Sequence, residues 1–496
     1  MRKMKRSVLC IVLTIAVSVF VSSAFAAKDS LKLGMVLEPP HLDPTAGAAA
    51  AIDEVVYANI FEGLTRIDRT GAVKPALAAS WTLSDDKKIY TFSLRKGVKF
   101  HDGASFEAGD VVFALNRARA ENSVNAQKAL FKPIESVTAK DDHTVVVTLS
   151  RPTGNFLFNM GWGDAVIVDE ASADKNKSNP VGTGHFKFSK WVKGDRVVMV
   201  GNDNYWGTPA KLKMATIKFI PDPAAAVSAL MAGDIDGFAN MLTPESLSQF
   251  ESDPRFKVVI GSTEGETILS TNNQRGPFKE LKVRQAIAHA IDRKAIVDGA
   301  MFGYGTPIGT HFAPHHPAYV DLINSYPYNP EKAKQLLAEA GYPDGIKGVI
   351  KLPPPSYARR GGEIVASQLR KIGIDLEIVP VEWAQWLDQV FKKRDYDLTI
   401  VSHTEPMDIG IYARKDYYFA YDNPKFQQLM EKLDVTVETQ DRYEILKQAQ
   451  KIISKDCVNG YMFQLAKHGV WNAKLRGLWE NSPVQANDFT EVYWVD

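Results

Sequence analysis

Residues 78–114 read AASWTLSDDKKIYTFSLRKGVKFHDGASFEAGDVVFA, and this stretch carries signals for two kinds of secondary structure in succession. Over 90–95, apolar Tyr, Phe and Leu alternate with Thr, Ser and Arg, the period of two that is typical of a half-buried strand. Asp102-Gly103 is a tight-turn signal. Residues 107–119 then read as a helix with acidic residues in the first turn, where they suit the helix dipole.

The chain on either side of this stretch predicts a mixed α/β fold with at least two sheets. The earlier part contains many short strands, which favours antiparallel pairing. The later part alternates helix 361–371, strand 375–381, helix 383–392 and strand 396–401, which indicates parallel strands joined by helical crossovers. Further helices are expected at 46–59, 222–232, 281–290 and 329–340.

The first 26 residues read as a secretory signal peptide. Basic MRKMKR precedes fifteen mostly apolar residues, and Ala24-Phe25-Ala26 is a cleavage signal with small residues at its ends. The apolar run is shorter than the roughly 20 residues that a membrane-spanning helix needs. The segment carries four basic residues and no acids, so cleavage after Ala26 changes the formal charge from +1 to −3. A nearly neutral exported chain is a poor candidate for binding nucleic acid or an anionic membrane.

Cysteine content fits a large exported protein without disulfides. Cys10 lies inside the apolar run, not at its end, which makes it a poor lipid-attachment site. Cys457 is then the only cysteine of the mature chain, and we expect it to be a small core residue on a helix. The remaining 470 residues predict two or three domains, large enough to be stable without a cross-link.

The sequence offers no established catalytic motif. A phosphate-binding loop, a dinucleotide fingerprint, H-E-x-x-H and G-x-S-x-G are all absent, and we expect no cofactor. Residues 310–317, THFAPHHP, hold three histidines, but two prolines break any helix there, so we interpret the stretch as a polar loop. By residue type His403, Glu405 and Asp408 are a better metal-ligand trio, which leaves an exported metal-dependent hydrolase as an alternative.

Two aromatic and polar junctions point to one rim of the later sheet. Trp383 lies where strand 375–381 gives way to a helix, and 402–419, SHTEPMDIGIYARKDYYF, follows strand 396–401. Ligands of α/β sheets bind at the carboxyl ends of strands. The two junctions therefore predict a binding site on that rim, without an identifiable nucleophile or base.

The chain resembles the peptide/nickel-binding family of extracellular solute-binding proteins, family five, which serve ABC importers. The resemblance spans nearly the whole mature chain. It is carried by Leu42-Asp43-Pro44, Ser80-Trp81, Tyr90-x-Phe92-x-Leu94-Arg95, Gly97-Val98-x-Phe100-His101-Asp102-Gly103, Asp110-Val111-Val112, Asn179-Pro180-Val181-Gly182-Thr183-Gly184, Asn204-Tyr205-Trp206-Gly207, Val283-Arg284-Gln285-Ala286-Ile287, Ala340-Gly341-Tyr342 and Asp395-Tyr396-Asp397-Leu398.

The resemblance implies a periplasmic-binding-protein-like architecture of three hinged lobes around a cleft. Residues 27–66, 180–265 and 472–496 would form lobe I, 67–179 an inserted lobe II, and 266–471 lobe III. It also implies a monomeric periplasmic protein that captures a small molecule or short peptide and delivers it to ABC permease subunits in the inner membrane. An opine, an oligosaccharide or a chelated metal is the alternative solute.

The resemblance also implies where the solute is held. Glu38 and Tyr57 of the first lobe become candidate pocket residues. In peptide binders of this family, a Trp and an Asp after the strand equivalent to 396–401 line the pocket, and the Asp pairs with the peptide α-amino group. Here His403 stands near the position of the Trp, and Glu405 or Asp408 would replace the Asp. Such a carboxylate needs a cation, which we expect to be either a ligand group or an internal arginine, with Arg414 the nearest candidate.

Overall fold

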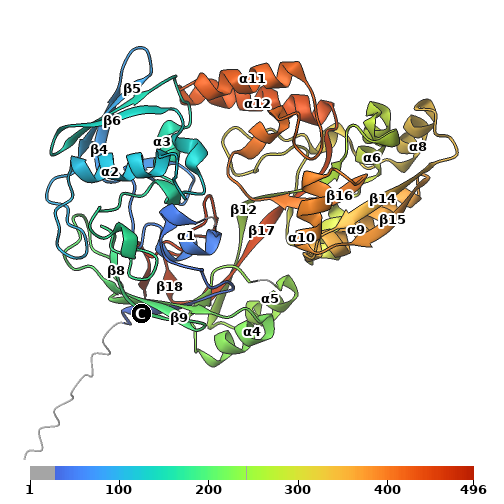
Figure 1. Cartoon of the computed structure of the whole chain (residues 1–496). Helices are drawn as coiled ribbons and strands as arrows, with labels where there is room; N and C mark the ends of the chain where they lie inside the picture. The colour runs from blue at the N-terminus through green and yellow to red at the C-terminus, as the bar shows by residue number, and fades with distance from the viewer. Residues whose placement is uncertain (1–27, 48, 242, 496) are drawn as a thin grey trace, which may run out of the picture.

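The computed structural model describes residues 28–47, 49–241 and 243–495 (Figure 1). The predicted signal peptide lies outside these residues. Within them, no helix combines the length and the apolar character that crossing a membrane requires.

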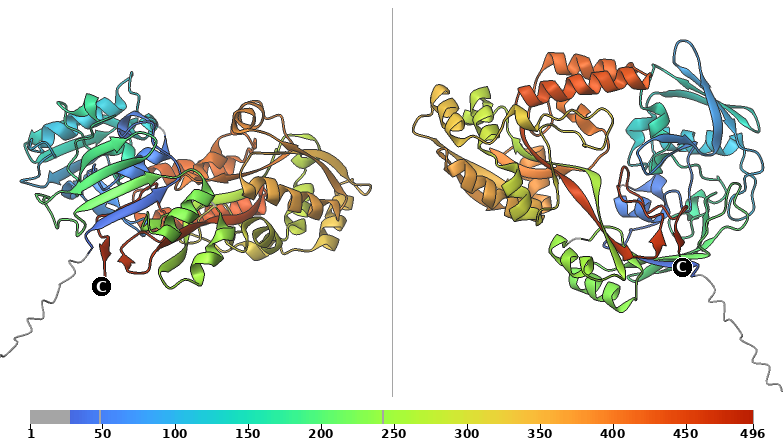
Figure 2. Two further views of the ribbon diagram at one scale, coloured as in Figure 1. Left: turned by 90° about the horizontal axis from the view of Figure 1, so that it is seen from below. Right: turned by 180° about the vertical axis from the view of Figure 1, so that it is seen from behind.

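One large sheet runs through the molecule and connects two bodies (Figures 1 and 2). Its two longest strands, β12 (Phe256–Thr271) and β17 (Asn459–Asn472), pair antiparallel and pass from one body to the other. We call residues 28–255 and 473–495, where described, the N-terminal body, and residues 272–458 the C-terminal body. A register shift between Ser262 and Glu266 interrupts the pairing of the two strands where they leave the N-terminal body.

The N-terminal body contains one end of that sheet and a separate four-stranded sheet. The large sheet continues from β17 through β11 (Gly237–Phe238), β1 (Ser30–Met35), β10 (Met214–Phe219), β9 (Arg196–Gly201) and β8 (Phe186–Val192). Its helices include α1 (Ala50–Val56), α4 (Pro223–Ala232) and α5 (Leu247–Glu251).

The four-stranded sheet confirms the reading of residues 78–114. Its strands are β4 (Ala78–Leu83), β5 (Ile89–Leu94), β7 (Thr144–Leu149) and β6 (Ile134–Asp141), all antiparallel. Tyr90, Phe92 and Leu94 are buried on one face of β5, while the residues between them are more exposed. Helix α2 (Ala108–Arg119) follows, with Asp110 in its first turn.

The C-terminal body confirms the predicted parallel strands. Strand β14 (Ile346–Leu352) pairs parallel with both β15 (Ile374–Pro380) and β16 (Leu398–His403). Helix α6 (Leu281–Ala290) has the predicted bounds. The predicted helix 383–392 is a short α-helix, α10 (Trp383–Trp386), continued by a π-helix over Leu387–Lys392. The other helices are α7 (Arg293–Met301), α8 (Pro330–Glu339), α9 (Ser356–Arg370), α11 (Pro424–Val435) and α12 (Thr439–Lys455).

Close backbone packing explains the glycines of the NPVGTG motif. The amides of Gly184 and Phe186 donate to the carbonyls of Ile60 and Asn59. A Cβ atom on Gly182 or Gly184 would overlap those same carbonyl oxygens. Only glycine lets the two segments approach this closely, so the motif fixes the start of β8 against the chain that follows α1.

Cys457 is a free, buried thiol, as expected. The prediction that it lies on a helix is wrong. It follows the end of α12 and has a φ of 44°, in the left-handed region where helices often terminate. Burial raises the pKa of its thiol to about 11, which keeps it in the unreactive protonated form at neutral pH.

Candidate functional site

Three side chains from separate segments of the C-terminal body meet beyond the end of β16. His403 is the last residue of that strand, Asp408 begins a 3-10 helix (Asp408–Ala413), and His311 comes from the loop after β13 (Thr306–Pro307). The His311 Nε2 atom lies 2.7 Å from Asp408 Oδ1, and the His403 Nδ1 atom lies 3.3 Å from Asp408 Oδ2. We call these three residues the His–Asp cluster. Its side chains are at most 11% exposed.

The two histidines determine the charge state of Asp408. Burial by itself would raise the pKa of this carboxyl, but the charges and hydrogen bonds of His311 and then His403 outweigh burial and hold the pKa below its ordinary value. Asp408 is therefore ionised at neutral pH. Its neighbours are imidazoles, so the expectation that Arg414 supplies the internal cation is wrong.

Glu266 adds a second buried carboxylate beside the cluster. It lies in β12 directly opposite His403 and is 4% exposed. Burial, and then the negative charges of Asp408, Glu264 and Glu405, raise its pKa well above the ordinary value. The raised pKa favours the protonated carboxyl, and a positive charge placed beside Glu266 would favour its ionised form instead.

Glu264 and Glu405 add negative charge near Glu266. Glu264 lies at the register shift of β12, and the His315 Nε2 atom is 2.6 Å from its carboxylate. Glu405 is exposed and accepts a hydrogen bond from the Thr404 amide. We call Glu264, Glu266, Glu405 and Asp408 the acidic wall.

An aromatic layer connects the acidic wall to Trp383. The Tyr418 hydroxyl lies 3.1 Å from His403 Nε2, and the Tyr418 ring meets that of Trp386 edge-on at 5.5 Å. Trp386 is buried and donates to Thr399, whereas Trp383, 5.8 Å from it, is 41% exposed. Strands β15 and β16 both run parallel to β14, so the junctions after them lie at the same edge of the sheet, as the sequence predicted.

The remaining predicted site residues have other contacts. Arg414 is exposed, lies 3.9 Å from the Asp416 carboxylate and packs over the Tyr417 ring. In the N-terminal body, Glu38 accepts hydrogen bonds from Trp191 Nε1 and the Gly194 amide. Tyr57 is buried, donating to the Gly161 carbonyl and accepting from the Ile67 amide. Glu38 and Tyr57 thus hold parts of the N-terminal body together.

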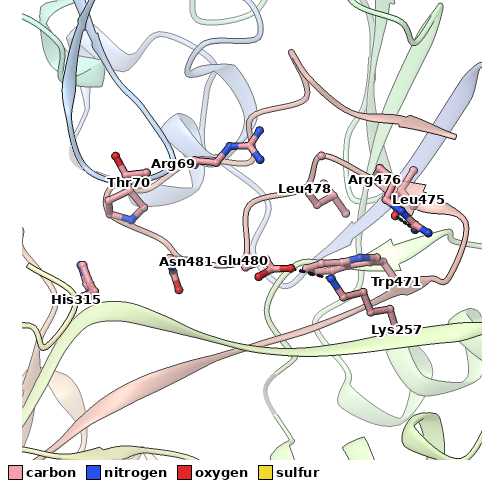
Figure 3. Close-up of a pocket in the computed structure, with 12 residues that line it drawn as sticks. Arg69, Thr70, Lys257, His315, Trp471, Leu475, Arg476, Leu478, Glu480 and Asn481 are labelled. Atoms are coloured by element: carbon pink, nitrogen blue, oxygen red, sulfur yellow. Dashed lines mark hydrogen bonds and ion pairs between the residues drawn. The ribbon is translucent and has the colours of Figure 1, made fainter. Parts of the chain in front are cut away.

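A cavity of about 380 Å³ lies where β12 and β17 meet the segment after β17 (Figure 3). His315 is its lining residue from the C-terminal body, and it also contacts Glu264 of the acidic wall. Basic side chains line the opposite side, among them Lys257, which is 2.7 Å from Glu480. The other lining residues are Arg69, Thr70, Trp471, Leu475, Arg476, Gly477, Leu478, Asn481 and Pro483.

The sequence pointed to His403 and Asp408, but not to the residues around them, which are His311, Glu264 and Glu266. The loop 310–317 was interpreted as polar, yet His311 is 1% exposed and binds Asp408. Glu264 and Glu266 were not singled out, although a glutamate entering an apolar strand, as in the sequence EGETILST, is a signal of buried charge. Glu405 was grouped with His403 and Asp408, but it points away to solvent and His311 takes its place.

Comparison with known proteins identifies the relatives of this chain. Residues 72–427 match the family described as "Bacterial extracellular solute-binding proteins, family 5 Middle". The chain is 34% identical to heme-binding protein A of Haemophilus influenzae, in a match that spans 63% of each chain. It is 31% identical to the glutathione-binding protein GsiB of Escherichia coli K12, over 76% of this chain and 74% of that one.

A solved structure shows the same fold over nearly the whole chain. The periplasmic binding protein DppA of Helicobacter pylori, in complex with the peptide STSA, superposes with a TM-score of 0.77 at 26% identity, covering 94% of this chain and 98% of that one. Proteins of this family bind solutes and are not enzymes, which sets aside the hydrolase alternative. The chain belongs to family 5 of the bacterial extracellular solute-binding proteins, the extracytoplasmic binding components of ABC importers.

Proposed function

We propose that this protein captures a peptide or peptide-like solute in the periplasm, between its two bodies, and delivers it as a monomer to permease subunits in the inner membrane. The observation that carries the proposal is Glu266, a buried acidic group whose charged neighbours are the carboxylates of Asp408, Glu264 and Glu405. A solute that brings positive charge to this wall offsets the cost of burying the carboxylate. The α-amino group of a peptide is such a charge.

The kinds of solute named for the relatives support a peptide. GsiB is a glutathione-binding protein, and DppA of H. pylori was solved with a four-residue peptide. The cavity of about 380 Å³ is in the range of pockets for small ligands, which suits a short peptide rather than a long one.

The three-lobe division supplies the motion for this capture. We propose lobe I at 27–66, 180–265 and 472–496, lobe II at 67–179, and lobe III at 266–471. The four-stranded sheet lies wholly within lobe II, and β12 and β17 are the strands that join lobes I and III. Rotation about the irregular pairing at Ser262–Glu266 would open and close the space between lobes.

Identification of the bound solute tests the proposed function directly. The exported protein is purified without denaturation, and native mass spectrometry is used to detect and sequence any bound molecule. We expect a peptide or a peptide-like mass, and a thermal shift of the emptied protein with members of a peptide library. Release of a sugar or an opine, together with no shift from any peptide, would contradict peptide capture.

Trp383 is expected to contribute to affinity as an exposed aromatic at the same sheet edge. Trp383→Ala should weaken binding of the tightest-binding peptide of the library by about 1–3 kcal/mol, roughly 5-fold to 150-fold, because stacking and burial of an indole are lost. Leu387→Ala is the matched control, because Leu387 is an exposed apolar residue in the π-helix that follows α10. Equal affinities of the two variants, measured by calorimetry, would remove Trp383 from the pocket.

A further inference from the structure

We propose that His311, His403 and Asp408 form a binding site for a divalent transition-metal ion in the cleft wall of the C-terminal body. Two imidazoles and a carboxylate are a donor set that suits Zn²⁺, Ni²⁺ and Co²⁺. The inference deepens the proposed function, because the ion would supply the positive charge that the acidic wall lacks.

The spacing of the donor atoms fits one small ion. One ligand atom from each of the three residues lies within 4.8 Å of the others. Metal bonds of about 2.0–2.2 Å in a tetrahedral site place neighbouring donors roughly 3.3 Å apart. The His403 Nδ1 atom is already 3.3 Å from Asp408 Oδ2, and the His311–Asp408 pair, at 2.7 Å, needs only a small separation.

Hydrogen bonding orients one of the two imidazoles for this role. The Tyr418 hydroxyl lies 3.1 Å from His403 Nε2, the nitrogen remote from Asp408. If a metal ion displaced the proton that His403 Nδ1 shares with Asp408, Nε2 would carry the ring proton and donate to Tyr418, and the Nδ1 lone pair would face the ion. A second hydrogen-bonding partner of this kind is usual for a metal-binding histidine.

Glu266 is a separate observation that points to a bound cation. Its carboxyl group is 4% exposed, lies across the strand pair from His403 and has the other carboxylates of the acidic wall as its charged neighbours. A cation held by the cluster would favour the ionised form of Glu266, and Glu266 and Asp408 together would then balance a divalent ion. Three ligands from the His–Asp cluster leave at least one coordination position for a donor atom of the solute.

Metal binding by the full mature protein tests the proposal. The protein is treated with a chelator, dialysed and titrated with Zn²⁺ or Ni²⁺ in a calorimeter, with the metal content checked by mass spectrometry. We expect one ion per chain with micromolar or tighter affinity. Co²⁺ should give the visible absorption of a low-symmetry site.

Variants separate this site from adventitious binding. His311→Ala and Asp408→Asn should each weaken Zn²⁺ binding at least tenfold and abolish the Co²⁺ absorption, and Glu266→Gln should weaken binding less. The control is His316→Gln, on the same loop, because the His316 ring packs on Phe312 and Tyr443 instead. Melting curves confirm that each variant is folded. If one of the two ligand variants is not folded, His403→Gln replaces it in the same Zn²⁺ and Co²⁺ measurements.

The outcomes distinguish the ion from the solute. Absence of stoichiometric binding to the folded protein, or wild-type affinity in both ligand variants, overturns the metal site, and the three residues are then only a hydrogen-bonded structural triad. If peptides still shift the melting of the chelator-treated protein, the proposed function survives that failure. An ion that binds as expected while no peptide binds, with or without it, supports the metal site and overturns peptide capture.

Discussion

Arg442→Ala is expected to lower the free energy of unfolding by about 2–4 kcal/mol and to loosen the two bodies from each other. Arg442 lies in α12 and is 7% exposed. Its guanidinium donates to the carbonyls of Leu433 (2.7 Å) and Thr436 (2.9 Å), and also to the side chain of Asn155 in the N-terminal body. Removing it deletes charge-assisted hydrogen bonds to largely buried acceptors, which costs more than the loss of an exposed contact.

The contact between Arg442 and Asn155 belongs to a small interface away from β12 and β17 (Figure 2). The Gly154 amide donates to the Asp434 carbonyl at 2.8 Å, and a Cβ atom on Gly154 would overlap the Arg442 guanidinium. The turn between α11 and α12 therefore docks on residues 154–155 of the N-terminal body. With the paired strands at one side and this docking at the other, the bodies are joined on two sides of the space between them.

Denaturant unfolding and small-angle scattering measure the two expected effects. Lys87→Ala is the control, because the Lys87–Glu438 pair (3.1 Å) belongs to the same interface but is exposed. Such a pair contributes at most about 1 kcal/mol. We expect the Arg442 variant alone to show a larger radius of gyration. An Arg442 variant as stable and as compact as the Lys87 variant would mean that the docking contributes nothing.

Elements with a local signal could be predicted from the sequence, whereas those that depend on distant pairing could not. The alternation of Tyr90, Phe92 and Leu94 and the periodicity of α6 are contained in short windows. The sequence did not predict strand β17, and it predicted only the last part of strand β12. They pair across about two hundred residues, and β12 changes from partly exposed to fully buried along its length.

The position of the His–Asp cluster, beyond the end of β16, agrees with the sequence prediction, but the residues that contact Asp408 were not predicted. Strand β16 and the residues after it were assigned to a binding rim, and the parallel pairing puts them there. The partners of Asp408 came from elsewhere: His311 is 97 residues away, on a loop whose prolines gave no sign of burial. Arg414 is closer in sequence, but the 3-10 helix over Asp408–Ala413 separates the two residues and leaves Arg414 exposed beside Asp416. Nearness along the chain was therefore a poor guide to the charge partner.

Acid is expected to destabilise the N-terminal body through His185. This residue lies just before β8, stacks on Tyr205 with ring centroids 3.7 Å apart, and has a buried Nδ1 atom without a hydrogen-bond partner. Burial, and then the charge of Arg66, lower the pKa of its imidazole from 6.5 to about 3. The folded state therefore binds no proton at this site at pH 5, whereas the unfolded state does.

The sign of the effect follows from the lowered pKa. Above pH 6.5 the imidazole is neutral in both states and the free energy of unfolding does not depend on it. As the pH falls below 6.5, His185 binds a proton in the unfolded chain but not in the folded chain. The free energy of unfolding therefore decreases until the pH reaches about 3. Between pH 6.5 and 5 the loss is about 2 kcal/mol for this one group.

His185→Phe isolates the contribution of His185 to the pH dependence of stability, because phenylalanine keeps a ring against Tyr205 and cannot be protonated. The measurement is urea unfolding of both proteins at pH 7.5 and pH 5. We expect the variant to lose about 2 kcal/mol less than the wild type over that interval, whatever its stability at pH 7.5. Other titrating groups are common to both proteins and cancel in the difference. Equal losses would show that His185 is protonated in the folded protein, despite its burial and the stacking of Tyr205 on its ring.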